Sequence, residues 1–445
     1  MSNKQIPATD SDLPIAIIGG GLGGLALAIG LAKHGLAIHI YEAAAAFSEI
    51  GAGVAFGVNS TRALELIDPL LLQGYKKHAT FNQDPELDEV MLCLCWGMDE
   101  RKVGGRKAGE RCGNIRDKRN PEKAKAMGVR TRSCIHRARL LDVLISMIPQ
   151  GITSFGKEFD RVEEETDGTL RLHFVDGSAA RARAMIGCDG VKSRSRTAVC
   201  GPGTEASFVG EYAYRALVPK AEAEGALGVH LAQNGYLFCG YDSYLISYPV
   251  EHGAFTNMVA ISQQPTEIGT AANRVDWTIP TTTAEFLHDF KGWNIPHIEV
   301  FQRHCHAYKW ALFHVQHSNS YYKGRMCLLG DSAHATTPHM GGGAGMAMED
   351  AYILSSLIGS LKSLNEVEDA FRAYDAVRRP RTQKLVQFSR DAGLLVRLAM
   401  PGVEDDTQAV LETLDEWYGW LWHEDLEAQL ETARQLLVKY SDEES

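Results

Sequence analysis

Three glycines near the start of the chain have the spacing of a phosphate-binding turn. Gly19, Gly21 and Gly24 form a GxGxxG pattern between an apolar strand and an apolar helix, within residues 14–34. In this pattern the first glycine permits a tight turn, the second lets backbone approach a pyrophosphate, and the third lets the helix pack closely on the strand. The phosphates would lie at the helix N-terminus, where free N–H groups and the positive end of the helix dipole attract anions. The pattern predicts a bound dinucleotide.

An acidic residue follows at a matching distance. Glu42 ends the next apolar strand, at residues 37–41, and lies roughly 20 residues after Gly24, as expected for a carboxylate that binds a ribose hydroxyl. Because a carboxylate repels a 2′-phosphate, FAD or NAD is expected here rather than NADP. The alternative is a degenerate Rossmann turn that is kept only for packing.

Two later strands also end at acidic residues. One apolar run closes at Asp189 and Gly190, before a helix that starts near Ser193. Another, residues 325–330, closes at Asp331 and is continuous rather than alternating. A continuous apolar run is typical of a strand in a buried parallel sheet. Either acid could instead serve only as a helix cap.

The strand before Asp331 leads into a further glycine-rich turn. Pro338 and His339 precede this turn, which contains Gly341, Gly343 and Ala344 and opens a long helix. Free N–H groups at such a helix start can stabilise negative charge on a bound group.

The order of the elements indicates that the chain leaves a central sheet and later returns to it. Residues 80–133 read as irregular with one strand-like run, and residues 208–313 read as mainly short strands with one helix at 283–290. Helical patterns fill residues 365–398 and most of the chain beyond residue 404. This discontinuous layout suits an enzyme whose site lies between two modules.

Length and composition narrow the functional class. The chain has 445 residues, more than the roughly 250–300 that share a single hydrophobic core. Its hydrophobic content of 45% and charged content of 23% are ordinary for a globular protein. The net charge of −11 argues against a nucleic-acid surface. The basic run at 101–132 is interpreted as a solvated loop.

The sequence gives no sign of disulfides, export or a membrane span. Nine cysteines form no CxxC pair, so buried free thiols in a reducing compartment are expected. The polar segment 1–12 does not resemble a signal peptide, and the apolar run 14–32 contains the glycine turn. A cytoplasmic location is therefore expected.

A group of histidines raises the question of a metal site. They lie at positions 297, 304, 306, 314 and 317. His304 and His306 would share one face of a strand, but no acidic ligand or further ligand spacing accompanies them. No metal is expected.

The three motifs around Gly19, Asp189 and Asp331 resemble those of the group A flavoprotein monooxygenases, the aromatic hydroxylases related to p-hydroxybenzoate hydroxylase. The resemblance covers roughly residues 12–395. It implies an α/β fold, with a Rossmann-like FAD-binding domain, an inserted β-sheet substrate domain and C-terminal helices. The expected boundaries are 12–80, 130–205 and 315–395 for the discontinuous FAD-binding domain, 81–129 for an irregular insertion, 206–314 for the β-rich substrate domain and 396–445 for the C-terminal helices.

The resemblance assigns a set of residues to tightly bound FAD. The glycine turn and Glu42 would hold the ADP part, Arg137 would lie beside the phosphates or ribose, and Asp331 would contact the ribityl or phosphate region. The Asp189 segment would touch both FAD and the nicotinamide coenzyme. The full set is Gly19, Gly21, Gly24, Glu42, Gly53, Arg137, Asp189, Gly190, Asp331, Pro338, Gly341, Gly343 and Ala344.

The family's chemistry implies the co-substrates. FAD is reduced by NAD(P)H and adds O2 to give a C4a-hydroperoxide, which transfers an electrophilic OH to an electron-rich carbon. A small phenol ionised in the site is the usual substrate. An unperturbed phenol titrates near 10, and cations or hydrogen-bond donors around its oxygen lower that pKa. The coenzyme has no domain of its own, so NADH and NADPH both stay open, as do a monomer and a homodimer.

Two residues of the β-rich module resemble a substrate clamp. Arg215 and Tyr248 look like the arginine and tyrosine with which fungal dearomatising phenol hydroxylases of tropolone, sorbicillin and azaphilone pathways hold a phenolate. Fungal salicylate 1-hydroxylases share the general pattern, including a GAG segment like 51–53. Arg215 could instead form a structural ion pair, and Tyr248 could be a core tyrosine. His339 would either touch the substrate or order water.

These assignments predict an FAD-dependent monooxygenase that hydroxylates a small phenol at an ortho or ipso carbon. A methyl group on that carbon gives a dearomatised dienone, as for an orcinaldehyde or resorcylic phenol of secondary metabolism. A carboxylate there leaves as CO2 and gives a catechol, as in salicylate 1-hydroxylases. The alternatives from other classes are a non-catalytic binding protein with an FAD-type fold, and a flavin oxidase or reductase.

Overall fold

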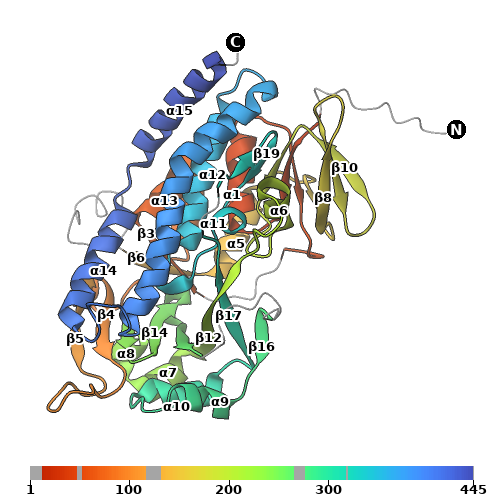
Figure 1. Cartoon of the computed structure of the whole chain (residues 1–445). Coiled ribbons are helices and arrows are strands. Elements are labelled where there is room, and N and C mark those ends of the chain that lie inside the picture. Colours follow the sequence, from red (N-terminus) through yellow and green to blue (C-terminus); the bar gives the residue numbers. More distant parts are fainter. Residues whose placement is uncertain (1–12, 48–52, 117–131, 265–275, 317–318, 444–445) are drawn as a thin grey trace.

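A six-stranded sheet and an eight-stranded sheet lie at opposite ends of the molecule, and long helices run past both (Figure 1). The computed structural model describes residues 13–47, 53–116, 132–264, 276–316 and 319–443. The fold is α/β, as the sequence predicted.

The central sheet has the strand order β18-β19-β11-β1-β2-β7. Its strands are β1 (Ile15–Ile18), β2 (Ile38–Tyr41), β7 (Thr153–Ser154), β11 (Ala184–Gly187), β18 (Tyr322–Lys323) and β19 (Met326–Leu328). β1 pairs in parallel with β2 and with β11, and β11 pairs in parallel with β19. The predicted departure from the sheet and return to it is confirmed. Consequently the chain segments that follow β1, β11 and β19 meet at one edge.

Both faces of this sheet are covered, as expected for its strands β1, β11 and β19, which are apolar throughout. One face packs on a helical layer in which α1 lies against α12, and the other packs on a small sheet of order β10-β9-β8. Each fully buried Ile or Leu side chain contributes about 1.5–3 kcal/mol. The covering elements are α1 (Leu22–Lys33), α5 (Arg137–Met147), α6 (Arg194–Cys200), α12 (Gly343–Gly359), β8 (Phe159–Glu164), β9 (Leu170–Phe174) and β10 (Ala179–Ala182).

The second sheet has the order β16-β17-β12-β15-β14-β13-β4-β5. Its strands are β4 (Val90–Trp96), β5 (Arg111–Arg116), β12 (Ser207–Pro219), β13 (Tyr236–Cys239), β14 (Ser243–Val250), β15 (Phe255–Gln263), β16 (Thr278–Pro280) and β17 (Tyr308–His314). β12, β15 and β14 are antiparallel neighbours.

The expectation of an irregular insertion at 81–129 is wrong for its described part. β5 is an edge strand of the eight-stranded sheet, β4 lies between β5 and β13, and every residue of β4 is buried. β4 pairs in parallel with β13, more than a hundred residues away in sequence, so no local pattern announces the pairing. Residues 117–131 lie outside the described part.

The module between the two passes of the central sheet also holds more helix than expected. Besides the predicted helix α9 (Thr283–Asp289), it contains α7 (Lys220–Leu227), α8 (Val229–Ala232) and α10 (Pro296–His304). His304 ends α10 and His306 precedes β17, so the expectation that both lie on one strand is wrong. Within the described residues no three His, Cys, Asp or Glu side chains are placed to hold a metal ion.

A short β-ribbon connects the two halves. β3 (Gly53–Gly57) pairs antiparallel with β6 (Arg132–His136), far away in the sequence. Two separate helices follow, α2 (Val58–Ile67) and α3 (Pro69–Lys76), because Asp68 ends the first and caps the second through the Leu70 N–H at 2.8 Å.

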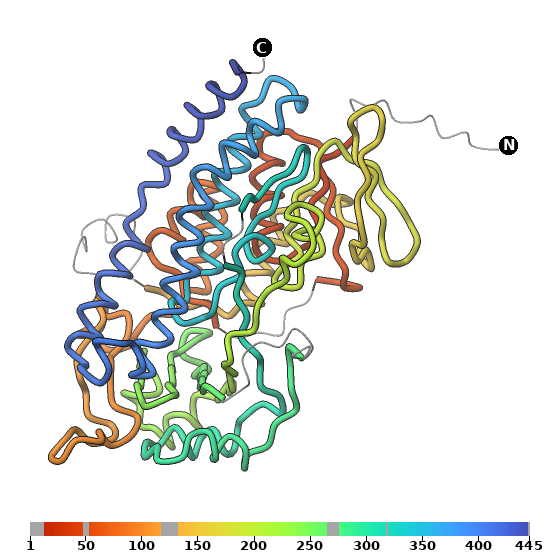
Figure 2. The backbone as a smooth tube through the Cα atoms, in the orientation of Figure 1, coloured from red at the N-terminus to blue at the C-terminus, as the bar shows by residue number. Residues whose placement is uncertain are grey.

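The predicted C-terminal helices are confirmed: α13 (Val367–Val396), α14 (Thr407–Trp422) and α15 (Leu426–Glu443). α13 contributes Phe371 and Tyr374 to the core around the central sheet, and Leu385 and Leu395 to a core that includes β4. It therefore joins the two halves. Figure 2 shows the red N-terminal segments and the cyan segments near residues 325–360 side by side in one half.

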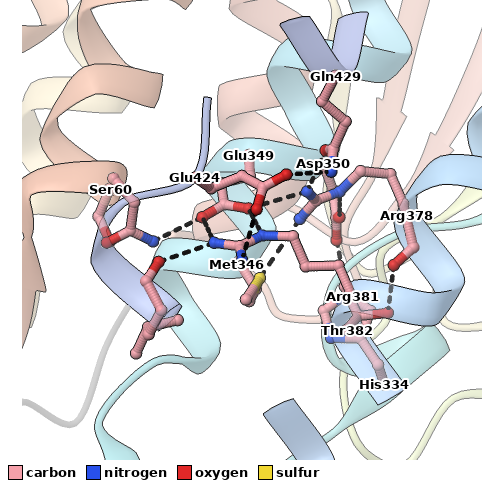
Figure 3. Close-up of polar contacts among 12 residues, drawn as sticks. Ser60, His334, Met346, Glu349, Asp350, Arg378, Arg381, Thr382, Glu424 and Gln429 are labelled. Atoms are coloured by element: carbon pink, nitrogen blue, oxygen red, sulfur yellow. Dashed lines mark hydrogen bonds and ion pairs between the residues drawn. The ribbon is translucent and has the colours of Figure 1, made fainter. Parts of the chain in front are cut away.

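A buried charge network fixes α13 against α12. Glu349 on α12 pairs with Arg378 at 2.8 Å and with Arg381 at 2.7 Å, while Asp350 pairs with Arg378 at 2.8 Å (Figure 3). Burial would raise the pKa of both carboxyls, but the guanidinium groups, and His334 beside Asp350, hold both pKa values below their ordinary range.

The same carboxylate also reaches the turn before α11 (Asp331–His334). The Oδ2 atom of Asp350 lies 2.5 Å from His334 Nε2 and accepts the Gly330 N–H at 3.2 Å. The network therefore sets where Asp331 and the start of α12 lie relative to each other.

Candidate active site

The glycine turn shapes the start of α1 as predicted. Gly19 has φ +105°, and a Cβ there would collide with the Cys188 carbonyl oxygen. A Cβ on Gly24 would collide with the Gly19 carbonyl oxygen, so Gly24 allows the helix to approach the strand. Gly21 is the N-cap of α1, and no side chain caps the helix. The first N–H groups of α1 are thus free to bind an anion.

A cavity of about 400 Å³ lies in front of this helix end. Gly19, Gly21, Glu42, Asp189 and Gly190 all line it, so the first group of predicted residues does meet in space. The Glu42 carboxylate accepts N–H hydrogen bonds from Gly20 at 2.7 Å and from Ala44 at 2.8 Å. These bonds hold it at the end of β2 beside the helix N-terminus. Donors for a pyrophosphate and an acceptor for a ribose are present together.

The Asp189 carboxylate is engaged in local hydrogen bonds. It accepts the Ser193 hydroxyl at 2.6 Å and the backbone N–H groups of Arg194 and Ser195 at 2.9 and 3.0 Å. Asp189 therefore stabilises the start of α6, which is the capping role considered from the sequence. It lines the cavity at the same time.

A cavity of about 290 Å³ lies between β12, β14, the ribbon β3–β6, α14 and the start of α12. The residues predicted for substrate and for the far end of the cofactor meet here. They are Gly53, Arg137, Arg215, Tyr248, Asp331, Pro338, His339, Gly341, Gly343 and Ala344. Much of the remaining wall is apolar and includes Leu237, Ile246, Val259, Ile261 and Leu414.

The helix start at this cavity repeats the chemistry of the first one. Gly342 is the N-cap of α12, and no side chain caps the helix. Asp331 does not cap α11, whose N-cap is Gly330, and it faces the cavity. The protein therefore presents free helix N–H groups at both cavities, which fits a long dinucleotide with phosphates at α1 and an electron-accepting ring system at α12.

Arg215 is a mostly buried cation with no carboxylate paired to it among the residues that the structure describes. It lies on β12, and its guanidinium carbon is 4.7 Å from the centre of the Trp310 ring. None of the described residues forms an ion pair or a side-chain hydrogen bond with this guanidinium group, so the structural ion pair considered from the sequence is absent there. Burial lowers its pKa, nearby Arg137 adds to that effect, and Tyr248 opposes it. An anionic ligand would relieve this unpaired charge.

Tyr248 is tied to the backbone. Its hydroxyl donates to the Gly53 carbonyl oxygen at 2.8 Å, and Arg132 lies over its ring at 4.8 Å. Burial raises the pKa of this tyrosine. Because a hydroxyl has a single proton, Tyr248 can accept a hydrogen bond from a ligand but cannot donate one while the Gly53 bond persists.

His339 belongs to a buried group that the sequence did not reveal. Its Nδ1 atom lies 2.8 Å from the Tyr244 hydroxyl, its Nε2 atom lies 2.9 Å from Glu211 Oε2, and Glu211 pairs with Arg397 at 2.6 Å. The imidazole packs against α13 where Gly393 leaves room, since a Cβ there would come within 2.7 Å of the ring. The one available sequence signal for this group was the carboxylate of Glu211 within a strand-like run. That signal did not identify the residues that Glu211 contacts.

No described helix is long and apolar enough to cross a bilayer.

A comparison with family models matches residues 12–389 to an FAD binding domain. The chain is 36% identical to a 6-methylsalicylate 1-monooxygenase of Aspergillus terreus, over 97% of this chain and 94% of that protein. It is 34% identical to a salicylate hydroxylase of Pseudomonas putida, over 97% and 95% of the two chains.

The solved structures include a salicylate hydroxylase in a substrate complex. It superposes with a TM-score of 0.78 at 30% identity and covers 96% of this chain and 98% of its own. The match therefore extends over nearly the whole length of both chains.

Proposed function

Because this chain belongs to the FAD-dependent aromatic monooxygenases of the salicylate hydroxylase group, we propose that it hydroxylates an ortho-hydroxybenzoate at the carboxylate-bearing carbon. In that reaction the substrate carboxylate, NAD(P)H, O2 and two protons give a catechol, CO2, water and NAD(P)+. The use of NAD(P)H and the substrate class are both part of the proposal.

The main support for this proposal is the guanidinium group of Arg215. A cation that is mostly buried, faces the cavity and lacks an ion-pair partner among the described residues favours an anionic substrate. A benzoate carboxylate matches the planar fork of an arginine. The aliphatic side chains of Leu237, Ile246 and Val259 on the same cavity suit the ring.

The residues present fit FAD, with the glycine turn and Glu42 at the ADP part and the start of α12 at the ring system. When bound, FAD supplies an electrophilic oxygen atom from O2 at the expense of a hydride from NAD(P)H. The protein holds the aromatic ring, keeps water from it with apolar walls, and stabilises negative charge on the substrate. An ionised phenol is the better target, since its oxygen donates electrons into the ring.

Dearomatising hydroxylation of a resorcylic or orcinaldehyde-type phenol is the second candidate. The presence of Arg215 and Tyr248 on one cavity favours it, because together they could hold a phenolate. The hydrogen bond from Tyr248 to Gly53 weakens this reading, since a phenolate needs a donor and the tyrosine proton is already used.

A substrate panel with labelled carboxyl groups separates the two. Purified protein with FAD is given salicylate, 6-methylsalicylate and an orcinaldehyde, each with NADH or NADPH. Oxygen uptake, released ¹³CO2 and product mass are measured. The proposal expects a catechol and CO2 in equal amounts from a salicylate. An orcinaldehyde that gains one oxygen and keeps all its carbons, with salicylates inert, would establish the second candidate instead. Protein that inserts oxygen into none of them would refute both.

A further inference from the structure

We infer that Arg132 and Tyr418 form a second binding point for the substrate, which holds a carboxylate at the far end of the ring from Arg215. The substrate class is then an ortho-hydroxybenzoate with a further carboxylate at C4 or C5, the ring positions remote from both existing substituents. This inference rests on the function proposed above. Arg132 is the first residue of β6, Tyr418 belongs to α14, and both side chains line the cavity of about 290 Å³.

The guanidinium group of Arg132 has unused hydrogen-bonding capacity. Its Nη1 atom donates to the Met91 carbonyl oxygen at 3.0 Å, whereas its buried Nε atom has no hydrogen-bond partner. No carboxylate in the part of the chain that the structure describes forms an ion pair with it. Two small cavities of about 10 Å³ each also border this side chain, so its surroundings are not closely packed. An anion would stabilise a partly buried cation in this state.

Tyr418 supplies a second donor near Arg132. It is only 3% exposed, and its ring stacks on that of Trp422 with 4.9 Å between the ring centres. Burial raises the pKa of Tyr418 to about 12, and Arg132 opposes this effect, so the hydroxyl group keeps its proton at neutral pH. A protonated hydroxyl group and a guanidinium group can both donate hydrogen bonds, and together they match an acceptor with two oxygen atoms. These two side chains therefore favour a carboxylate.

The strand order separates this point from Arg215. The Arg215 guanidinium carbon lies 4.7 Å from the centre of the Trp310 ring, which belongs to β17. The Arg132 guanidinium carbon lies 4.8 Å from the centre of the Tyr248 ring, which belongs to β14. β12 and β15 lie between these two strands, and three strand spacings amount to roughly 14 Å. A benzene ring with carboxylates at opposite or nearly opposite positions, each paired with a guanidinium group, has a comparable length.

Tyr248 lies within electrostatic reach of both cations. Burial raises the pKa of Tyr248, and Arg132 and Arg215 both oppose this effect. The carboxylate and the hydroxyl group of salicylate occupy adjacent carbons, so salicylate bound at Arg215 leaves the donors of Arg132 and Tyr418 unused. A second carboxylate across the ring would engage these donors and fix the orientation of the ring between the two ends of the cavity.

The test measures the binding of four ligands to the oxidised holoenzyme. 4-Carboxysalicylate and 5-carboxysalicylate carry the second carboxylate, whereas 4-methylsalicylate and 5-methylsalicylate carry a neutral group at the same positions. Dissociation constants are obtained from the change in flavin absorbance on binding, and FAD content is measured in parallel. Wild type is compared with Arg132→Met, Arg132→Lys and Tyr418→Phe. The matched controls are Arg372→Met, at an exposed pair with Glu443, and Tyr308→Phe, at an exposed tyrosine.

Wild type is expected to bind at least one carboxysalicylate about 10-fold or more tightly than the methylsalicylate substituted at the same position, because hydrogen bonds to charged groups are the stronger ones. Arg132→Met should abolish this ratio and leave FAD content and the binding of the methylsalicylates unchanged. Arg132→Lys should restore part of the ratio, since an ammonium group keeps the charge but lacks the planar fork. Tyr418→Phe should reduce the ratio by a smaller factor, and both controls should match the wild type.

Failure of the second binding point differs from failure of the function. Wild-type protein that releases CO2 from salicylate, but binds each carboxysalicylate no more tightly than its methyl counterpart, would overturn the second binding point alone. A ratio that survives in Arg132→Met would do the same, as would loss of FAD in that variant, which would assign Arg132 to the cofactor. Wild-type protein that hydroxylates no hydroxybenzoate would overturn the function itself. If Arg132→Met does not fold, Tyr418→Phe decides, because it removes a single oxygen atom.

Discussion

The Tyr248 hydroxyl donates to the Gly53 carbonyl oxygen at 2.8 Å and thereby joins β14 to β3. Tyr248, which the resemblance assigns to phenolate binding, thus already uses its hydroxyl proton in a hydrogen bond within the protein. Arg215 lines the same cavity and has no ion-pair partner among the described residues, so the two halves of the expected clamp are unequal.

Tyr248→Phe should therefore affect stability more than chemistry. Losing this hydrogen bond is expected to lower the free energy of unfolding by about 1 kcal/mol, while kcat with a salicylate changes little. Urea denaturation and steady-state kinetics measure the two effects. A large fall in kcat at unchanged stability would instead identify Tyr248 as a direct substrate donor.

Arg215→Met, which keeps the length of the side chain and removes its charge, should retain FAD and lose most substrate-stimulated NAD(P)H oxidation. Losing one member of a buried, hydrogen-bonded charge pair costs about 2–5 kcal/mol, which corresponds to a loss of about 30-fold or more in kcat/KM. Arg161→Ala, at an exposed surface pair with Asp160 and Glu163, is the control and should behave as wild type. Equal rates in Arg215→Met and wild type would remove the proposed substrate anchor.

Alanine substitutions at two glycines of the first turn should affect cofactor binding and folding stability separately. A Cβ on Gly21 meets no atom within 4 Å, whereas a Cβ on Gly24 collides with the Gly19 carbonyl oxygen. Gly21→Ala should fold with an unchanged melting temperature of the apoprotein but lose FAD, because the methyl group occupies the approach of the pyrophosphate. Gly24→Ala should lower the melting temperature itself. Flavin absorbance after desalting and apoprotein melting curves test the pair, and FAD retained by Gly21→Ala would contradict the assigned phosphate site.

The buried network between α12 and α13 should make stability depend on pH. The pKa values of Glu349 and Asp350 lie below the ordinary range in the folded protein. The unfolded chain therefore binds protons more readily, and the contribution is fully present above the ordinary carboxyl pKa values near 4. It is lost as the pH falls through the lower folded-state values.

Asp350→Asn should remove part of this dependence. It leaves Arg378 and His334 with weaker partners, and breaking a buried ion pair typically costs about 3–5 kcal/mol. Urea denaturation of both proteins at several pH values between neutral and about pH 3 measures how the free energy of unfolding depends on pH. The exposed pair between Arg372 and Glu443 offers a control, because Arg372→Ala should change stability by less than about 1 kcal/mol. A wild-type protein equally stable at both ends of that range would contradict the role of the network.

The local sequence pattern was sufficient to predict those motifs whose geometry depends only on neighbouring residues. The strand, glycine turn and helix around Gly19, and the strand ends at Asp189 and Asp331, could be read from the sequence because each needs only neighbouring residues to form. The resemblance to a known family then supplied the order of the modules and the expected meeting of Arg215 with the glycine turn before α12.

Tertiary structure decided what depends on distant partners. β4 is an isolated apolar run in the sequence until β13 pairs with it. The sequence leaves Asp189 open as a ligand or a cap, and only the structure shows its oxygens bonded at the start of α6. Glu211 and His339 are more than a hundred residues apart, and each has an ordinary local sequence. Their contact exists because β12 and the turn before α12 pack against the end of α13, and hydrogen-bond partners of buried polar groups are set by such packing rather than by local spacing.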